Sequence, residues 1–245
     1  MRRLLPILLA LLATPVVAVE CRDIAFETNR YTICEVDARN EDLRLFLRGP
    51  DRGILGSFAN IETELQGQGT HLSFAMNAGM YHRDRAPVGL YLENGVQEQR
   101  LITSAGPGNF GLVPNGVFCI GKGRADVIET KRFARQTPAC RFASQSGPML
   151  VIDGKLHPRF LKDSASRYIR NGVGTSADGR RAVFAISDDA VTFHAFGRLF
   201  RDGLALPQAL YFDGSISRLY APDLGRHDAG FPMGPIVGVV APGGD

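Results

Sequence analysis

The sequence has no run of eighteen consecutive apolar residues, and its charge is close to balanced. The first absence predicts a mature protein without a membrane-spanning helix. The 28 Lys and Arg residues stand against 25 Asp and Glu residues, so the charge gives no reason to expect a nucleic-acid partner. Linkers, internal repeats and low-complexity tracts are also missing, which favours a single domain.

Sequence motifs for metal ions and common cofactors are missing too. There is no C-x-x-C pair, and the five histidines show no metal-ligand spacing, so we expect no bound metal and no cofactor. Residues 104–111 are rich in glycine, but the Lys-Ser/Thr pair of a phosphate-binding loop does not follow them. We interpret this segment as a loop that borders a site.

The first eighteen residues have the composition of a secretory signal peptide. Arg2 and Arg3 form a short basic region, residues 4–12 are almost purely apolar, and small residues lead up to Ala18. We expect cleavage after Ala18, which leaves residues 19–245 as the mature domain in the periplasm or outside the cell. Cleavage takes the basic residues from 28 to 26 against 25 acids, a net charge of +1. A membrane anchor that is kept is the alternative.

Four cysteines remain after such a cleavage: Cys21, Cys34, Cys119 and Cys140. An even number of cysteines in an exported chain predicts two disulfides. Three pairings are possible. The local pairing, Cys21 with Cys34 and Cys119 with Cys140, is favoured because each bond would tie neighbouring strands together.

Strands outnumber helices in the pattern of apolar residues. Continuous apolar runs at 72–76 and 209–212, bounded by turn residues, predict interior strands. The segments 88–97 and 172–186 have the pattern of hairpins, each with a turn that contains glycine after Asn or Asp.

Two segments have the apolar spacing of helices. Residues 57–66 follow a capping Ser57, and residues 192–204 place phenylalanine and leucine on one face. We therefore predict an α+β fold: a single domain with a largely antiparallel or mixed sheet and a few packed helices. The helix-to-strand unit near residues 192–213 could add a local parallel pairing.

Five predicted strands share one feature, a polar residue beside glycine at the strand end. This repetition suggests that the strand ends converge on a cleft with several uncharged donors, one cation and one carboxylate. The five polar residues are Asn77, Asn115, Ser146, Arg170 and Asp213.

Taken in order, these segments resemble motifs of the phosphodiester glycosidase family. The resemblance covers roughly residues 70 to 240. It departs from the family at one place, where Ser215 and Ile216 replace two of three consecutive glycines. The segments that carry it are Asn77-Ala78-Gly79-Met80-Tyr81, Ser146-Gly147-Pro148-Met149-Leu150, Arg170 ahead of Val173-Gly174, Asp188 after Ala185-Ile186-Ser187, and Asp213-Gly214-Ser215-Ile216-Ser217.

The resemblance implies an exported hydrolase that cleaves the glycosidic C–O bond of a sugar-1-phosphodiester, small or polymeric, in envelope or exopolysaccharide metabolism. A phosphate monoester, whose second pKa is about 6, is a good leaving group, so one carboxylate and one cation are a plausible minimum. Asp213 is expected at the anomeric carbon, Arg170 on the phosphate, and Asp188 as a second acid. The expected substrate-binding residues are Asn77, Gly79, Tyr81, Asn115, Ser146, Gly147, Gly214 and Ser217.

Other interpretations of the same residues stay open. Asn77 could satisfy a turn, Arg170 could be a structural ion-pair partner, Asp188 could cap the helix near residue 192, and Tyr81 could belong to the core. At the level of function, the alternatives are a serine hydrolase that uses Ser146, although the G-x-S-x-G elbow is missing, and an exported carbohydrate-binding module without catalysis. The sequence leaves the natural sugar and the oligomeric state open.

Overall fold

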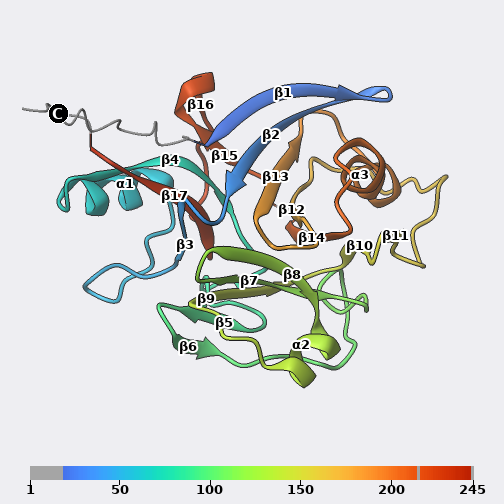
Figure 1. Ribbon diagram of the computed structural model, residues 1–245, viewed down its shortest axis with the longest axis horizontal. Coiled ribbons are helices and arrows are strands. Elements are labelled where there is room, and N and C mark those ends of the chain that lie inside the picture. The colour runs from blue at the N-terminus through green and yellow to red at the C-terminus, as the bar shows by residue number, and fades with distance from the viewer. Residues whose placement is uncertain (1–18, 214–215, 244–245) are drawn as a thin grey trace, which may run out of the picture.

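Three antiparallel sheets make up most of the molecule in the computed structural model, which describes residues 19–213 and 216–243 (Figure 1). The predicted signal peptide and Gly214 lie outside the described residues. In Figure 1 the sheet that carries β1 and β2 lies at the top right, the sheet of β4 and β17 at the left, and the sheet of β5 to β9 at the bottom.

The first sheet has seven strands in the order β1-β2-β13-β12-β14-β10-β11. The apolar run 209–212, which predicted an interior strand, lies in β14 near the centre of this sheet, and Ala209 to Phe212 are completely buried. The strands are β1 Glu20–Phe26, β2 Asn29–Asp37, β10 Met149–Ile152, β11 Lys155–Leu156, β12 Asn171–Thr175, β13 Arg181–Ser187 and β14 Gln208–Asp213.

The other two sheets have five strands each. The second sheet has the order β16-β15-β4-β17-β3, with β3 Asp42–Phe46, β4 Thr70–Asn77, β15 Leu219–Ala221, β16 Arg226–His227 and β17 Ile236–Pro242. The third has the order β6-β5-β9-β7-β8, with β5 Tyr91–Glu93, β6 Val96–Gln99, β7 Gly116–Gly121, β8 Arg124–Glu129 and β9 Phe142–Ser146.

One hydrophobic core joins the three sheets. Phe184 of the first sheet lies 4.8 Å from Phe74 of the second and 5.7 Å from Phe118 of the third, measured between ring centroids. All three side chains are completely buried, and each such burial stabilises the fold by about 1.5–3 kcal/mol. A shared core of this kind means that no sheet is a separate folding unit.

Each helix covers the outer face of one sheet. Helix α1, Phe58–Gln66, packs Phe58, Ile61 and Leu65 on the second sheet, and the Ser57 side chain caps it by accepting a hydrogen bond from the Asn60 N–H. Helix α3, Phe193–Arg198, continues into one turn of π-helix, η1 Leu199–Gly203, over the first sheet. Helix α2, Thr130–Gln136, lies on the third sheet, and η2, Pro222–Leu224, is a single 3₁₀ turn.

The structure confirms the α+β class, both predicted helices and both hairpins. It also contains the two predicted disulfides, Cys21–Cys34 and Cys119–Cys140. The predicted parallel pairing near residues 192–213 was wrong. Both neighbours of β14, the strands β10 and β12, run antiparallel to it. The strand β13, which precedes α3, does run in the same direction as β14, but β12 lies between the two.

Candidate functional site

Three of the five polar strand-end residues that the sequence predicted to converge, Asn77, Ser146 and Asp213, are linked at the junction of the three sheets. Asn171 links them, because its Nδ2 donates to the Asn77 Oδ1 over 3.0 Å and its Oδ1 accepts from the Asp213 N–H over 3.3 Å. The Ser146 Oγ donates to the Phe212 carbonyl over 2.7 Å. Residues from β4, β9, β12 and β14 therefore form one continuous polar network.

Most of these polar side chains hold backbone atoms. Asn77 is completely buried; its Nδ2 donates to the Ile216 carbonyl over 2.7 Å and its Oδ1 accepts from the Arg218 N–H over 2.9 Å. The Asn115 Nδ2 donates to the Phe110 carbonyl over 2.8 Å, and the Ser217 Oγ to the Ile169 carbonyl over 3.1 Å. A buried amide with several hydrogen bonds fixes the loops that it touches.

Two of the three glycines of the predicted set, Gly79 and Gly147, lie in the described part of the chain and are required by close packing. A Cβ atom on Gly79, whose φ is +81°, would lie 2.4 Å from the Ser144 Oγ, and one on Gly147 would lie 2.6 Å from the Asn115 Cβ. Neither position has room for a side chain.

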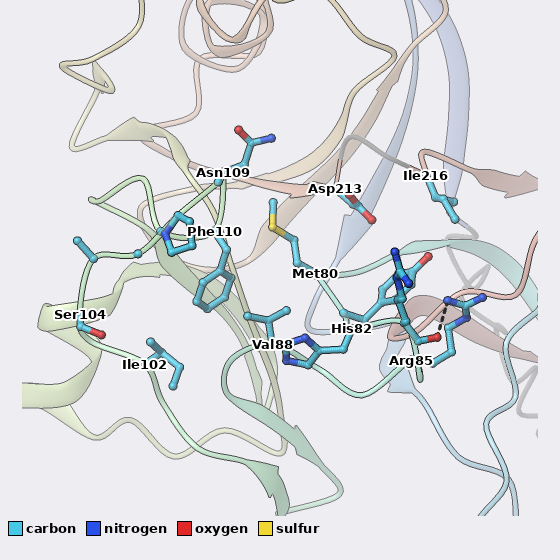
Figure 2. Close-up of a pocket in the computed structure, with 17 residues that line it drawn as sticks. Met80, His82, Arg85, Val88, Ile102, Ser104, Asn109, Phe110, Asp213 and Ile216 are labelled. Atoms are coloured by element: carbon cyan, nitrogen blue, oxygen red, sulfur yellow. Dashed lines mark hydrogen bonds between the residues drawn. The ribbon is translucent and has the colours of Figure 1, made fainter.

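An open cavity of about 690 Å³ lies beside the network. Its walls are the segment 80–88 and the loop 102–111, and Asp213 and Ile216 complete it. Figure 2 shows Asp213, Ile216 and Arg85 on one side and Phe110, Ile102 and Ser104 on the other, with Met80 and Val88 between them in this view. The loop that the sequence predicted to border a site is thus one wall of this cavity.

The segment 80–88 is a tight hairpin that brings two arginines, Arg83 and Arg85, to the cavity. The Val88 N–H donates to the Met80 carbonyl over 3.0 Å at the base. The Arg85 N–H donates to the His82 carbonyl over 2.9 Å at the tip, with Arg85 at a φ of +72°.

Tyr81 lies near three charged residues, Asp213, Arg85 and Arg218. Burial raises the pKa of its hydroxyl, Asp213 raises this pKa further, and Arg85 and Arg218 oppose the effect. Its buried hydroxyl has no hydrogen-bond partner among the described residues. A ring packed against Gly234, where a Cβ atom would lie 2.5 Å from the Tyr81 Cγ, is held in place.

Arg170 is enclosed in the protein and does not line the cavity. It is 1% exposed, and its guanidinium donates to the Val191 and Ser166 carbonyls and, over 3.3 Å, to the Tyr211 hydroxyl. It also stacks 3.7 Å from the centre of the Phe193 ring, and burial lowers its pKa.

The contact with Tyr211 connects Arg170 to the cavity. Burial raises the pKa of Tyr211, Arg170 opposes the effect, and the charge of Asp213 raises this pKa further. The charges of Arg170 and Asp213 therefore act on Tyr211 in opposite directions.

Asp188 lies apart from Asp213, two strands away across the first sheet. Its Oδ1 forms an ion pair with Arg226 over 3.0 Å, and both residues line a second cavity, of about 540 Å³. The interpretation of Asp188 as a helix cap was wrong, because the Thr192 side chain caps α3.

The sequence reasoning missed four residues of the site: Arg83, Arg85, Asn171 and Gln145. The Gln145 Oε1 accepts from the Ile102 N–H over 3.0 Å and its Nε2 donates to the Ile102 carbonyl over 2.6 Å, which fixes one end of the wall loop. Asn171 and Gln145 stood next to predicted residues in strand-end motifs, and that position was the available signal. Arg83 and Arg85 fall in a loop without any motif.

Within residues 19–213 and 216–243, no group of three His, Cys, Asp or Glu side chains is placed to hold a metal ion. No helix in this part of the chain has the length and apolar character needed to cross a membrane.

The model of the phosphodiester glycosidase family matches residues 70–231. The chain belongs to this family. It is 35% identical over 216 residues to the uncharacterized protein YigE of Escherichia coli (strain K12), a match that covers 87% of this chain and 84% of the relative.

Solved structures show the same fold. The catalytic domain of zebrafish N-acetylglucosamine-1-phosphodiester alpha-N-acetylglucosaminidase, auto-inhibited by its pro-peptide, matches with a TM-score of 0.58 and 13% identity over 92% of this chain and 84% of that one. A hypothetical protein from Synechocystis matches with a TM-score of 0.56 and 13% identity over 91% of this chain and 62% of that one. A Burkholderia pseudomallei K96243 protein described as a putative exported protein matches with a TM-score of 0.54 and 10% identity over 86% of this chain and 74% of that one.

Proposed function

We propose that this member of the phosphodiester glycosidase family hydrolyses a sugar-1-phosphodiester in the cavity beside Asp213. One observation carries the proposal: the cavity combines a carboxylate at the end of β14 with two arginines of the 80–88 hairpin. A phosphodiester substrate needs this pair of charges, a carboxylate near the anomeric carbon and a cation near the phosphate.

In the proposed reaction the bond between the anomeric carbon and the phosphate oxygen breaks. The electron pair of that bond leaves with the phosphate, the oxygen of a water molecule bonds to the anomeric carbon, and a proton is released. We assign Asp213 to the anomeric carbon. The leaving phosphate monoester has a second pKa of about 6, so it can depart without a strong acid if a cation holds it.

Arg83 and Arg85 are better placed than Arg170 to hold the phosphate. Both line the cavity, whereas Arg170 is 1% exposed and already donates to three oxygens. Arginine binds phosphate oxygens through two parallel hydrogen bonds. We therefore assign the phosphate to Arg85 with Arg83, and give Arg170 the role of a positioning residue that acts through Tyr211.

The remaining predicted residues keep distinct roles in this proposal. Tyr81 lines the cavity, and we assign its hydroxyl to the substrate, whereas Asn77, Asn115, Ser146 and Ser217 support the loops. Asp188, held by Arg226, remains a second candidate acid.

The two disulfides support an exported protein, because disulfides persist in oxidising compartments. Residues 1–18 supply the matching signal-peptide pattern. We therefore propose the periplasm or the cell exterior as its location.

The experiment is incubation of the protein with a panel of sugar-1-phosphodiesters, with release of free sugar and phosphate monoester as the measurement. The Asp213→Asn variant should lose at least about 1,000-fold in kcat while keeping the far-ultraviolet circular dichroism of the wild type, since a positioned carboxylate contributes on this scale. Turnover by Asp213→Asn within about tenfold of the wild type would contradict the assignment. Saturable sugar binding without product release would favour the carbohydrate-binding alternative.

Ser146 is a poor nucleophile in this setting. Its Oγ is completely buried and donates to the Phe212 carbonyl, and no histidine of the described residues contacts it. Labelling of Ser146 by a serine-directed phosphonate would be needed to support a serine hydrolase.

A further inference from the structure

The cavity beside Asp213 is charged along one edge and largely apolar beyond it. The charged edge is Asp213 with Arg83 and Arg85. The apolar wall, as we call it below, consists of Met80, Val88, Ile102 and Phe110, which all line the same cavity and are all partly exposed to it. Figure 2 shows Met80 and Val88 between the charged edge and Phe110.

Polar groups are few on the loop side of this cavity. From Ile102 to Gly111 the loop has no charged side chain, and Ser104 and Asn109 are the polar side chains that it adds to the lining. A sugar or other polyhydroxy alcohol would lose many hydrogen bonds to water on such a wall and regain few.

The apolar wall is built as a fixed surface. Gln145 holds both the N–H and the carbonyl of Ile102, and Asn115 holds the Phe110 carbonyl. The tip of the Phe110 ring packs on Gly89, where a Cβ atom would lie 2.5 Å from it. A surface held in this way is organised before a ligand arrives, which reduces the entropy lost on binding.

From this arrangement we infer that the preferred substrate is a sugar-1-phosphodiester whose second alcohol is apolar, an alkyl or isoprenoid chain. The inference rests on the proposed function and adds the class of the leaving group. Arg85 and Arg83 bind the phosphate, and the chain lies along the apolar wall. The cavity, about 690 Å³, falls in the usual range of ligand sites and has room beyond one sugar phosphate. Hydrolysis then yields the free sugar and an alkyl phosphate monoester.

The test compares substrates with the same sugar and different alcohols: methyl, n-octyl and citronellyl, a branched isoprenoid of similar length. We expect kcat/KM for the octyl or the citronellyl substrate to exceed that for the methyl substrate by about tenfold or more, the gain expected from burying two or three methylenes. Preference for citronellyl over octyl would indicate an isoprenoid chain, and the reverse a straight alkyl chain.

A matched pair of variants locates the effect. Val88→Thr keeps the shape of the side chain but puts a hydroxyl on the apolar wall, and it should remove most of the preference for the longer alcohol, measured as the ratio of kcat/KM for the octyl substrate to that for the methyl substrate. Val96→Thr makes the same change on β6, where the side chain is 71% exposed, and should leave both substrates unchanged. Phe110→Ala provides a second test of the wall.

Binding of the products separates the two proposals. The Kd values of n-octyl phosphate and methyl phosphate, measured calorimetrically below the micelle concentration, should differ at least tenfold in the wild type and less in Val88→Thr. Equal Kd values, or equal kcat/KM for methyl and octyl substrates, would overturn the apolar leaving group and leave the hydrolase intact. Selective binding of octyl phosphate without hydrolysis of any substrate would overturn the hydrolase and support the ligand class.

Discussion

Asn77 and Asn171 hydrogen bond to each other through their side chains, across the junction between the second and the first sheet. The Asn171 Nδ2 lies 3.0 Å from the Asn77 Oδ1, and the Asn77 Nδ2 lies 3.4 Å from the Asn171 Oδ1. Both residues are completely buried. The same Asn171 Oδ1 accepts a hydrogen bond from the Asp213 N–H, so the pair contacts the end of β14.

Because of this pair, we expect Asn171→Ala to lower the free energy of unfolding strongly. The substitution removes an amide that serves Asn77, Asp213 and Ser217, and it leaves buried polar groups without partners, each worth about 1–3 kcal/mol. We expect a loss of about 2–4 kcal/mol in the free energy of unfolding, measured by urea denaturation. The exposed Gln68→Ala is the control and should change it by less than about 0.5 kcal/mol. A loss below about 1 kcal/mol for Asn171→Ala would show that the junction does not depend on this pair.

Arg85 and Arg170 should respond differently to the same conservative change. Arg85→Lys keeps the charge but loses two-point binding of phosphate, so KM should rise several-fold with the unfolding free energy unchanged. Arg170→Lys loses the stack on Phe193 and the fixed hydrogen bonds of the buried guanidinium, so it should cost about 1–3 kcal/mol of unfolding free energy.

Steady-state kinetics and thermal denaturation of both variants decide between the two arginines. If Arg170→Lys raised KM without lowering the stability, Arg170 and not Arg85 would be assigned as the residue that binds the phosphate.

The hydroxyl of Tyr81 is predicted to serve the ligand and not the fold. Because it has no partner among the described residues, Tyr81→Phe should leave the unfolding free energy unchanged or slightly increased. If the hydroxyl donates to the bound substrate, kcat/KM should fall about tenfold, the value of one hydrogen bond of about 1.4 kcal/mol. Tyr220→Phe, on β15, is the control and should leave kcat/KM unchanged. Full activity of Tyr81→Phe would remove Tyr81 from the site.

We expect the stability of the fold to depend on pH through the partly buried carboxyl of Glu41. Burial raises the pKa of its carboxyl to about 7, and the charge of Asp37 adds to the effect, whereas a hydrogen bond from the Asp37 N–H opposes it. A carboxyl whose pKa is raised by folding stabilises the fold below its unfolded value of about 4.5, and this contribution is lost as the pH rises through about 7.

Glu41→Gln isolates this contribution, since its side chain stays neutral and keeps an acceptor for the Asp37 N–H. Between pH 4.5 and 8 the wild type should lose on the order of 1–2 kcal/mol relative to the variant, after allowance for solvent screening. Urea denaturation of both proteins across this range measures the difference. Parallel curves for the two proteins would contradict the raised pKa.

The sequence predicted those parts of the fold that depend on local patterns. The apolar run Ala209 to Phe212 is an interior strand because side chains on both of its faces are buried. Ser57 caps α1 because its side chain meets the free N–H of Asn60. Helix α2 was missed, because it buries one threonine, carries few apolar residues and is capped by Glu129.

The site was predicted less completely because it depends on the packing of distant segments. Five strand ends could be named, and three of them, Asn77, Ser146 and Asp213, are joined by the polar network, whereas only Asp213 lines the cavity. The role of an arginine depends on its burial, which local sequence does not show. Arg170 and Arg85 both lie in irregular segments. Arg170 is enclosed by Phe193 and Tyr211, whereas Arg85 lines the cavity. Asp188 and Asp213 also have similar local sequence, and the strand order places them two strands apart.

Gln145 and Asn115 hydrogen bond to the loop 102–111 only through backbone atoms of Ile102 and Phe110. These hydrogen bonds do not depend on which side chains stand at 102 and 110. Substitutions at the two positions should keep this support of the loop, so a change of leaving group is open to engineering through few substitutions. Grafting polar side chains at these two positions is the direct way to turn the protein toward hydrophilic leaving groups.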